Sequence, residues 1–221
     1  MTSHTIGEIT LSISTVIYVV WFLPQIWENF QRKSTRGLSL WMHGLLLLGY
    51  TIDLMYGFGR HMQWQYRLVT IAGLICLFVQ HIQFALYDLK SKREYWNYVV
   101  LTVLVLTVFV YSILNLTVFH HGKWYYDMMG YLESVCYFTY LFPQIIKNFH
   151  EKSTDGLSSL FVAFSIVLSL LDFTSALTLH WDLPSLLMPT IDFAKKTMVV
   201  FQIFYYRDKN LLERARNNSR N

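Results

Sequence analysis

Six ionisable side chains stand inside long apolar stretches of this chain: Asp53, Glu133, Asp172, Asp192, Lys195 and Lys196. A charged group inside a membrane is costly, so such residues are assigned a functional role by default. Carboxylates can hold an ammonium group or take up protons, and a lysine ammonium can hold a carboxylate. The residue types therefore point to binding of a small charged solute and leave protons open as a second ligand.

Asp53 and Asp172 lie 119 residues apart (172 − 53), which is also the offset of an internal repeat. We predict that they take symmetric positions about a shared axis, where two matched carboxylates would face a substrate ammonium or protons. The alternative is two carboxylates near the outer surface that bond to backbone groups or water.

Lys195 and Lys196 fall near the middle of the last apolar stretch. Neighbouring residues of a helix point about 100° apart, so at most one of the two lysines faces the centre of a cavity. Asp192 and Lys196 stand at i and i+4, so they can pair on one helix face. We predict that Lys196, or failing it Lys195, forms the positive half of a central site, with Glu133 or Asp192 as its partner.

Two histidines, His43 and His81, also lie within apolar stretches. Imidazole titrates near neutral pH, so this pair can relay protons; structural hydrogen bonding explains the pair equally well. Cys76 and Cys136 are interpreted as small buried apolar residues rather than as a disulfide or a metal pair. No nucleotide-binding loop, nucleophile triad or metal cluster is visible, so we expect no enzymatic activity, no cofactor and no metal site.

An internal repeat organises the elements that position these residues. Residues 23–39 read L-P-Q-I-W-E-N-F-Q-R-K-S-T-R-G-L-S, and residues 142–158 read F-P-Q-I-I-K-N-F-H-E-K-S-T-D-G-L-S. Eleven of the seventeen aligned positions are identical, without a gap, at an offset of 119 residues. Repeats of this length indicate one structural unit used twice. The K-S-T segments, 33–35 and 152–154, are expected to cap the helices that follow them.

Each repeat carries a proline–glutamine pair near one end of an apolar span. Pro24 and Pro143 remove a helical hydrogen bond and clash with the preceding turn, so we predict a break in the helix at both sites. Gln25 and Gln144 are expected to bond the freed carbonyls or to line a cavity. We interpret the four residues as two hinges; the alternative is two static kinks.

Composition places the chain in a membrane. It has 221 residues, 54% hydrophobic and only 14% charged, whereas soluble domains carry roughly 25% charged residues. A spanning helix needs about 20 mostly apolar residues. Seven such spans are predicted, with the first retained in the mature protein because it lacks a basic leader: about 7–30, 38–58, 68–88, 97–116, 126–149, 157–179 and 184–206. The net charge of +4 is spread over short clusters between the spans, so it favours a lipid bilayer rather than nucleic acid as partner.

Basic residues set the expected orientation. With the N-terminus outside, thirteen Lys and Arg residues fall in cytoplasmic segments and three, Arg60, Arg67 and Lys123, fall outside. Lys and Arg favour the cytoplasmic side, so we expect the C-terminus in the cytoplasm. The repeat maps spans 1 to 3 onto spans 5 to 7. The predicted fold is therefore all-α with two parallel three-helix bundles, 1–95 and 119–207, a linker helix at 96–118 and a tail at 208–221.

The paired P-Q dipeptides, each followed by K-S-T-x-G-L-S, resemble the PQ-loop family of membrane transporters. The K-S-T-x-G-L-S motif is most similar to that of cystinosins. SWEET sugar transporters and the KDEL receptor are more distant relatives of the same fold. The resemblance aligns Glu133 and Tyr140 with lysines of cystinosin span 5, and Lys196 with an aspartate of span 7. Charges are thus exchanged between the two spans, and these positions join the candidate site.

The resemblance implies transport of a small solute by alternating access, with the P-Q segments letting one end of the bundle open. The substrate expected is an amino acid or similar zwitterion, cystine-like or cationic, bound between the bundles. The alternatives are a cargo receptor of the KDEL-receptor type and a lipid-handling PQ-loop protein. A lysosomal or other endomembrane is expected if the source is eukaryotic, and the inner membrane if it is bacterial.

Overall fold

The computed structural model describes residues 3–89, 91–119, 121–180 and 183–218, with side chains for all of these except 183–188 and 207–218. Every secondary-structure element in these residues is helical. The elements are α1 (Ser3–Val20), α2 (Leu23–Arg32), α3 (Leu40–Gly59), α4 (Trp64–Tyr87), α5 (Lys92–Leu114), the π-helix η1 (Asn115–Phe119), α6 (Lys123–Thr139), α7 (Phe142–Glu151), α8 (Ser159–Thr178) and α9 (Leu183–Asn218). The predicted tail and its basic residues from Arg207 on lie outside the described side chains, and Lys90 lies outside the described residues.

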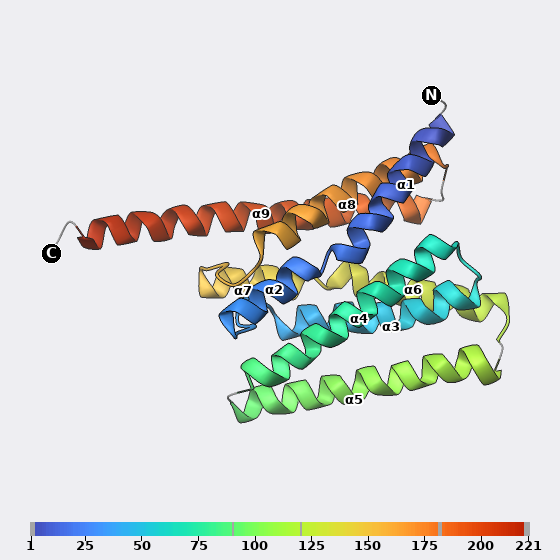
Figure 1. Ribbon diagram of the computed structural model, residues 1–221, viewed down its shortest axis with the longest axis horizontal. Helices are drawn as coiled ribbons and strands as arrows, with labels where there is room; N and C mark the ends of the chain where they lie inside the picture. The colour runs from blue at the N-terminus through green and yellow to red at the C-terminus, as the bar shows by residue number, and fades with distance from the viewer. Residues whose placement is uncertain (1–2, 90, 120, 181–182, 219–221) are drawn as a thin grey trace.

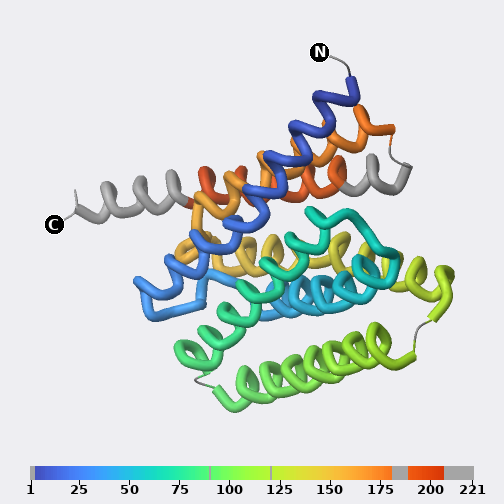
Figure 2. Tube along the Cα trace, turned by 45° about the vertical axis from the view of Figure 1, so that its right-hand side comes forward, coloured from blue at the N-terminus to red at the C-terminus, as the bar shows by residue number. Residues whose placement is uncertain are grey.

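The helices run back and forth between two ends of the molecule (Figure 1). We call the end that holds α2 and α7 the PQ end, and the opposite end the far end. α4 packs against both α1 and α3, and α9 packs in the same way against α6 and α8. The two sets meet through the pairs α1–α8 and α3–α6, while α5 packs on α3 at the edge away from α9 (Figure 2).

Long apolar helices are present, as the composition predicts. By length and hydropathy, four segments of the described chain can cross a membrane: Ser3–Arg32, Trp64–Tyr87, Lys92–Phe119 and Ser159–Thr178. The chain is therefore a helical membrane protein.

Both predicted helix breaks are present. α1 ends at Val20 and α2 begins at Leu23, and α6 ends at Thr139 and α7 begins at Phe142. Each proline occupies the first turn of the new short helix, where its missing N–H group would have no partner in any case. The prolines thus start α2 and α7 rather than kinking a continuous helix from within.

The prediction that the K-S-T segments cap the next helices is wrong. Lys33 and Lys152 end α2 and α7 in the left-handed conformation, with φ of 48° and 49°. The caps of α3 and α8 are instead Ser39 and Ser158, whose hydroxyls accept the backbone N–H groups of Met42 and Phe161. The K-S-T segments form the turns between the helices, because their lysines already terminate the preceding ones.

Candidate functional site

The two K-S-T-x-G-L-S turns meet each other at the PQ end. Gly37 and Gly156 approach so closely that a Cβ on Gly37 would lie 2.2 Å from the carbonyl carbon of Gly156. Gly156 also has φ of +84°, a conformation that glycine adopts without strain. Backbone-to-backbone contact between the two repeats therefore needs glycine at both turns.

Each glutamine of a P-Q pair binds the turn of the other repeat. Gln25 Nε2 donates to the carbonyl oxygen of Gly156 at 2.9 Å, and its Oε1 accepts the backbone N–H of Ser158 at 2.7 Å. Gln144 makes the equivalent bonds, to Gly37 at 2.9 Å and from Ser39 at 2.7 Å. We call these four bonds the reciprocal clasp. Of the two expectations for the glutamines, bonding of the freed carbonyls is not observed, because both reach across to the opposite repeat. Gln144 meets the other expectation, since it lines a small pocket at this end.

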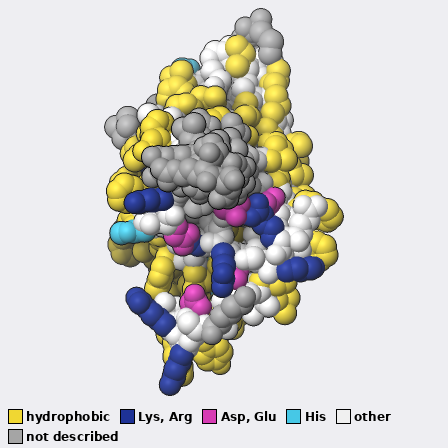
Figure 3. Space-filling model, turned by 90° about the vertical axis from the view of Figure 1, so that its left-hand side faces the viewer, with side chains coloured by type: hydrophobic (Ala, Val, Ile, Leu, Met, Phe, Trp, Pro, Cys, Tyr) yellow, Lys and Arg dark blue, Asp and Glu magenta, His cyan; other side chains and the backbone are white. Residues whose placement is uncertain are grey.

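Further contacts across the repeats surround the clasp. Arg32 Nη1 lies 2.8 Å from Asp155 Oδ1, and Lys147 Nζ donates to the carbonyl oxygens of Arg36 and, at 2.8 Å, Leu38. Figure 3 views this end of the molecule and shows several Lys and Arg side chains with acidic side chains among them. The PQ end is thus closed by polar bonds that join one half of the chain to the other.

A cavity of about 600 Å³ lies between the two halves and reaches the α3–α4 connection at the far end, where His61 and Met62 line it. Six charged groups face it: Asp53, Glu133, Asp172, Asp192, Lys195 and Lys196. These are the six ionisable residues with which the sequence analysis began. Gln25 does not line this cavity, and neither does Gln144.

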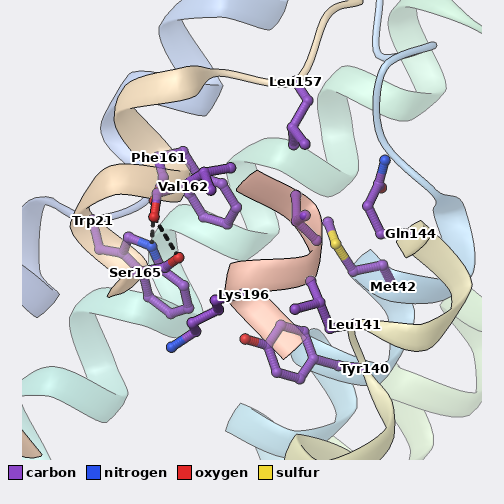
Figure 4. Close-up of a pocket in the computed structure, with 11 residues that line it drawn as sticks. Trp21, Met42, Tyr140, Leu141, Gln144, Leu157, Phe161, Val162, Ser165 and Lys196 are labelled. Atoms are coloured by element: carbon purple, nitrogen blue, oxygen red, sulfur yellow. Dashed lines mark hydrogen bonds between the residues drawn. The ribbon is translucent and has the colours of Figure 1, made fainter. Parts of the chain in front are cut away.

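Toward the PQ end the path narrows to a pocket of about 10 Å³, which is room for about one water molecule. Trp21, Tyr140 and Lys196 line both this pocket and the large cavity, so they form the partition between them. Figure 4 shows Lys196 reaching between the two aromatic rings. Trp21 stacks on Phe161 at 5.2 Å and donates to its carbonyl oxygen at 3.1 Å.

Trp21 was missed by the sequence analysis, although the signal was available. Trp21 and Tyr140 are repeat-equivalent (140 − 21 = 119), and each sits in the break between two helices. Tyr140 entered the candidate site only through the resemblance to cystinosins. Applying the repeat offset to it would have identified the second aromatic residue of the partition.

The two lysines share one counter-ion. Asp192 pairs with Lys196 through Oδ2 and with Lys195 through Oδ1 at 3.1 Å. Lys196 Nζ also donates to Ser169 at 2.9 Å, and the Tyr140 hydroxyl reaches Asp192 at 3.5 Å. Asp192 is thus the partner of Lys196. The alternative partner, Glu133, makes no ion pair with either lysine among the described side chains.

Asp53 and Asp172 both line the cavity, from the repeat-equivalent helices α3 and α8. Their partners differ, because Asp172 accepts the Tyr18 hydroxyl of α1 at 2.5 Å, whereas Asp53 accepts hydroxyls of α4: that of Tyr66 and, at 2.6 Å, that of Thr70. Asp53 is buried and Asp172 is half-buried, and both accept hydroxyl groups within the protein.

Glu133 lies beside Asp53 rather than beside a lysine. Its Oε1 accepts the Tyr66 hydroxyl at 3.5 Å, and the same hydroxyl bonds Asp53. The two carboxyl groups therefore share one donor. Glu133 is 7% exposed, and its Oε2 has no hydrogen-bond partner among the described residues.

His43 does not belong to the cavity. It lines neither pocket and bonds Gln80 at 3.0 Å and His81 at 3.2 Å, and His81 bonds Thr102 of α5 at 2.9 Å. The network joins α3, α4 and α5 behind the cavity wall. Of the two interpretations of this histidine pair, structural hydrogen bonding fits the observed contacts.

The chain repeats one unit at an offset of 119 residues, and both P-Q pairs take part in the reciprocal clasp. The PQ loop repeat model matches the chain twice, over residues 6–66 and 125–185. The chain belongs to the PQ-loop repeat family. The family's two repeats contain α1 to α3 and α6 to α8, which are the helices that carry the clasp and most of the cavity wall.

The relatives of this chain include proteins named as amino acid transporters. The chain is 49% identical over 49 residues (22% of this chain, 17% of the relative) to lysosomal amino acid transporter 1 homolog of Homo sapiens. It is 25% identical over 183 residues (72% of this chain, 44% of the relative) to cystinosin of Drosophila melanogaster. A vacuolar lysine transporter, YPQ1 of Saccharomyces cerevisiae, is 43% identical over 58 residues (26% and 19%). The chain thus spans less than half the length of each of these relatives.

A solved structure shares the fold. A eukaryotic SWEET transporter superposes with a TM-score of 0.67 at 15% identity, covering 93% of this chain and 99% of that one. At this identity the likeness establishes the fold alone. The chain therefore shares the fold of that structure.

Proposed function

We propose that this protein carries an amino acid, cationic or cystine-like, across an endomembrane by alternating access. The observation that carries the proposal is the 600 Å³ cavity between the two repeats, lined by ammonium and carboxylate groups and sealed at the PQ end by the clasp. Pockets of ~300–1,000 Å³ suit small ligands. The lysosomal and vacuolar transporters among the relatives support this class of solute.

The charges in the cavity suggest how the solute is held. Lys196 uses two of its three donors, on Asp192 and Ser169, so a third can bind the carboxylate of an amino acid. Asp192 and Asp172 are within the same cavity for its ammonium group. Four carboxyl groups against two ammonium groups favour a solute with an additional positive charge, such as lysine.

Seven crossings in a 3+1+3 plan are part of this proposal. α4 and α9 pack alike within their halves, and α5 joins the halves, which fits bundles at 1–95 and 119–207 with a linker at 96–118. The PQ end carries the exposed basic residues Arg32, Lys33 and Arg36, so it faces the cytoplasm under the positive-inside rule. The cavity then opens to the lumen or outside.

Exchange of labelled L-lysine by the purified full chain in liposomes tests the proposal. We expect saturable exchange of L-lysine, no exchange of D-glucose, and exchange that saturates only at higher L-lysine in Lys196→Met. L-histidine and L-cystine extend the panel across the two solute classes. Binding of L-lysine without any flux would contradict transport and would instead favour a receptor that uses the same fold.

A further inference from the structure

The break between α6 and α7 leaves two carbonyl groups that a continuous helix would have bonded. In such a helix the carbonyls of Tyr137 and Phe138 would accept the N–H groups of residues 141 and 142, and no such bond exists among the described residues. Lys195 of α9 takes their place. Its Nζ donates to Tyr137 at 3.0 Å and to Phe138 at 2.9 Å.

The same ammonium group lies 3.1 Å from Asp192 Oδ1. The two carbonyls take two of the three donors of the ammonium, and the contact with Asp192 is an ion pair, since Asp192 Oδ1 accepts no hydrogen bond among the described residues. Asp192 faces the cavity, whereas the two carbonyls belong to the hinge. One side chain, 4% exposed, therefore joins a charge of the solute site to the broken backbone of the hinge.

The internal repeat shows that the fold does not require this link. The position equivalent to Lys195 in the first half is Cys76 (195 − 119), and Gly73 stands in place of Asp192 (192 − 119). The break between α1 and α2 has the same geometry without a lysine, and there the backbone N–H of Trp21 reaches the carbonyl of Tyr18 at 3.4 Å. The lysine is thus an addition to one hinge only.

We infer that Lys195 is a positioning residue that makes movement of the α6–α7 hinge depend on whether Asp192 holds a solute. The inference rests on the proposed function, since it needs a solute with an ammonium group. While Asp192 is free, it and the two carbonyls hold Lys195, and the hinge stays bent. A solute ammonium that binds Asp192 competes for that carboxylate, which weakens the hold of Lys195 on the break.

Thiol labelling of the sealed pocket measures this dependence directly. Ser165 lines the small pocket and is 4% exposed, so a cysteine at this position reacts with a water-soluble thiol reagent only when the PQ end opens. The measurement uses Ser165→Cys in the full chain, with Cys76 and Cys136 replaced by serine. L-lysine is the probe, and the quantity measured is the ratio of labelling rates with and without it.

We expect L-lysine to raise the labelling rate when Lys195 is present and to leave it unchanged in Lys195→Met. Lys195→Arg should restore the response, because a guanidinium can also donate to two carbonyls and a carboxylate. The matched control is Lys196→Met, which removes the neighbouring ammonium but no contact with the hinge. That variant should need more L-lysine and still respond at saturation, which a merely structural loss would not reproduce.

The outcomes separate the two proposals. If Lys195→Met responds to L-lysine as the wild-type lysine does, the inference is overturned while the proposed function stands. If Lys195→Met loses the response and Lys195→Arg does not regain it, the inference that hydrogen-bond donors at position 195 carry the response is overturned. Absence of both exchange and response in the protein with Lys195 present would overturn the proposed function, and the inference with it.

Discussion

Asp192 is the shared counter-ion of two lysines, Lys195 and Lys196. The number of charges left unpaired therefore decides how substitutions act at the site. Removing the carboxylate in Asp192→Asn leaves two neighbouring ammonium groups, each with a 5% exposed side chain, without a counter-ion. Breaking a buried ion pair costs about 3–5 kcal/mol. We expect Asp192→Asn to lose about 3 kcal/mol of stability, because the aspartate side chain is itself 23% exposed. Thermal unfolding of the purified protein measures the loss.

Lys196→Met should be much milder, since it leaves Lys195 and Asp192 as a balanced pair. The double variant Asp192→Asn, Lys196→Met should recover part of the stability lost in Asp192→Asn alone, because it removes one of the two unpaired charges. Equal destabilisation by the single and the double variant would show that the charges are not coupled.

Asp53 and Glu133 contact the same Tyr66 hydroxyl, and like charges in one buried site repel each other, so we expect one of the two groups to carry a proton. We expect the rate of L-lysine exchange to change as that proton is lost on raising the pH, because ionising both groups places two negative charges between α3 and α6. Glu133→Gln keeps a hydrogen-bond donor but cannot lose a proton, so its rate should not follow this step. Exchange rates measured over a pH series test the prediction.

Asp172 supplies the matched control for this pair. It is the repeat equivalent of Asp53, but the repeat equivalent of Glu133 is Ser14 (133 − 119), which has no carboxyl group. Asp172→Asn should therefore retain the pH step, whatever its own rate of exchange. If the pH step disappears in Asp172→Asn and persists in Glu133→Gln, the titrating proton belongs to Asp172 rather than to the Asp53 and Glu133 pair, which contradicts the prediction.

At the residue scale, the sequence predicted the charged groups of the cavity but not all of their partners. The i, i+4 spacing allowed the pairing of Asp192 with Lys196, because that contact lies within one helix. The placement of Glu133 beside Asp53 depends on how α6 is rotated against α3, and no local pattern encodes that rotation. The place of His43 behind the cavity wall depends on packing of the same kind, since periodicity does not say which neighbour a buried face meets.

Among the elements, the turns at the PQ end are held by side chains of the opposite half. Gln144→Ala removes the bond to Gly37 and leaves the buried N–H of Ser39 without its acceptor. An unpaired buried donor costs about 1–3 kcal/mol, and this cost falls only on the closed state. We expect faster labelling of Ser165→Cys in Gln144→Ala, by about fivefold or more for each kcal/mol lost.

Gln25→Ala should have an effect of similar size, because its bonds to Gly156 and Ser158 are the equivalent ones. Ile146→Ala, at a side chain of α7 that is 55% exposed, is a control that leaves the clasp intact. Unchanged labelling in both glutamine variants would show that the glycine contact alone closes this end.

If the helix breaks act as hinges, the prolines should affect the rate of hinge movement rather than binding. Pro143→Ala supplies an N–H group that can bond the carbonyl of Thr139 in a continuous helix. One such bond is worth about 1 kcal/mol, which corresponds to a roughly fivefold slower step if the hinge limits the rate. We expect slower exchange of L-lysine at unchanged Kd, measured by flux and by equilibrium binding. Normal flux would favour a static kink.

The helix breaks were predictable because proline acts locally, whereas the clasp was not. Gln25 and Gln144 bond a turn more than a hundred residues away in sequence, and only the packing of the two repeats brings each glutamine to the other's turn. The repeat predicts that Gln25 and Gln144 make similar contacts, but it does not predict which groups the two glutamines bond.

Across the whole molecule, a symmetric scaffold carries an asymmetric site. The offset of 119 residues and the repeated helix order could be predicted from sequence, and the fold is shared with a SWEET transporter. The charges of α9 have no counterpart in α4, where the positions of Lys195 and Lys196 are occupied by Cys76 and Leu77. The scaffold thus follows the repeat, whereas the charged groups of α9 depart from it.

If alternating access requires the PQ end to open, holding its two turns together should stop transport without emptying the site. Arg32 and Asp155 face each other across the repeats at 2.8 Å, with side chains 43% and 77% exposed, so cysteines placed there can be joined by a short, cleavable bifunctional thiol reagent. With Cys76 and Cys136 replaced by serine, we expect the cross-linked Arg32→Cys, Asp155→Cys protein to lose exchange of L-lysine. Binding should persist at a Kd close to that of the unlinked protein, because the cavity stays open at the far end. Cleaving the linker should restore exchange, and the same reagent on Arg32→Cys alone should have no effect. Full exchange by the cross-linked protein would mean that solute leaves by a route other than the PQ end.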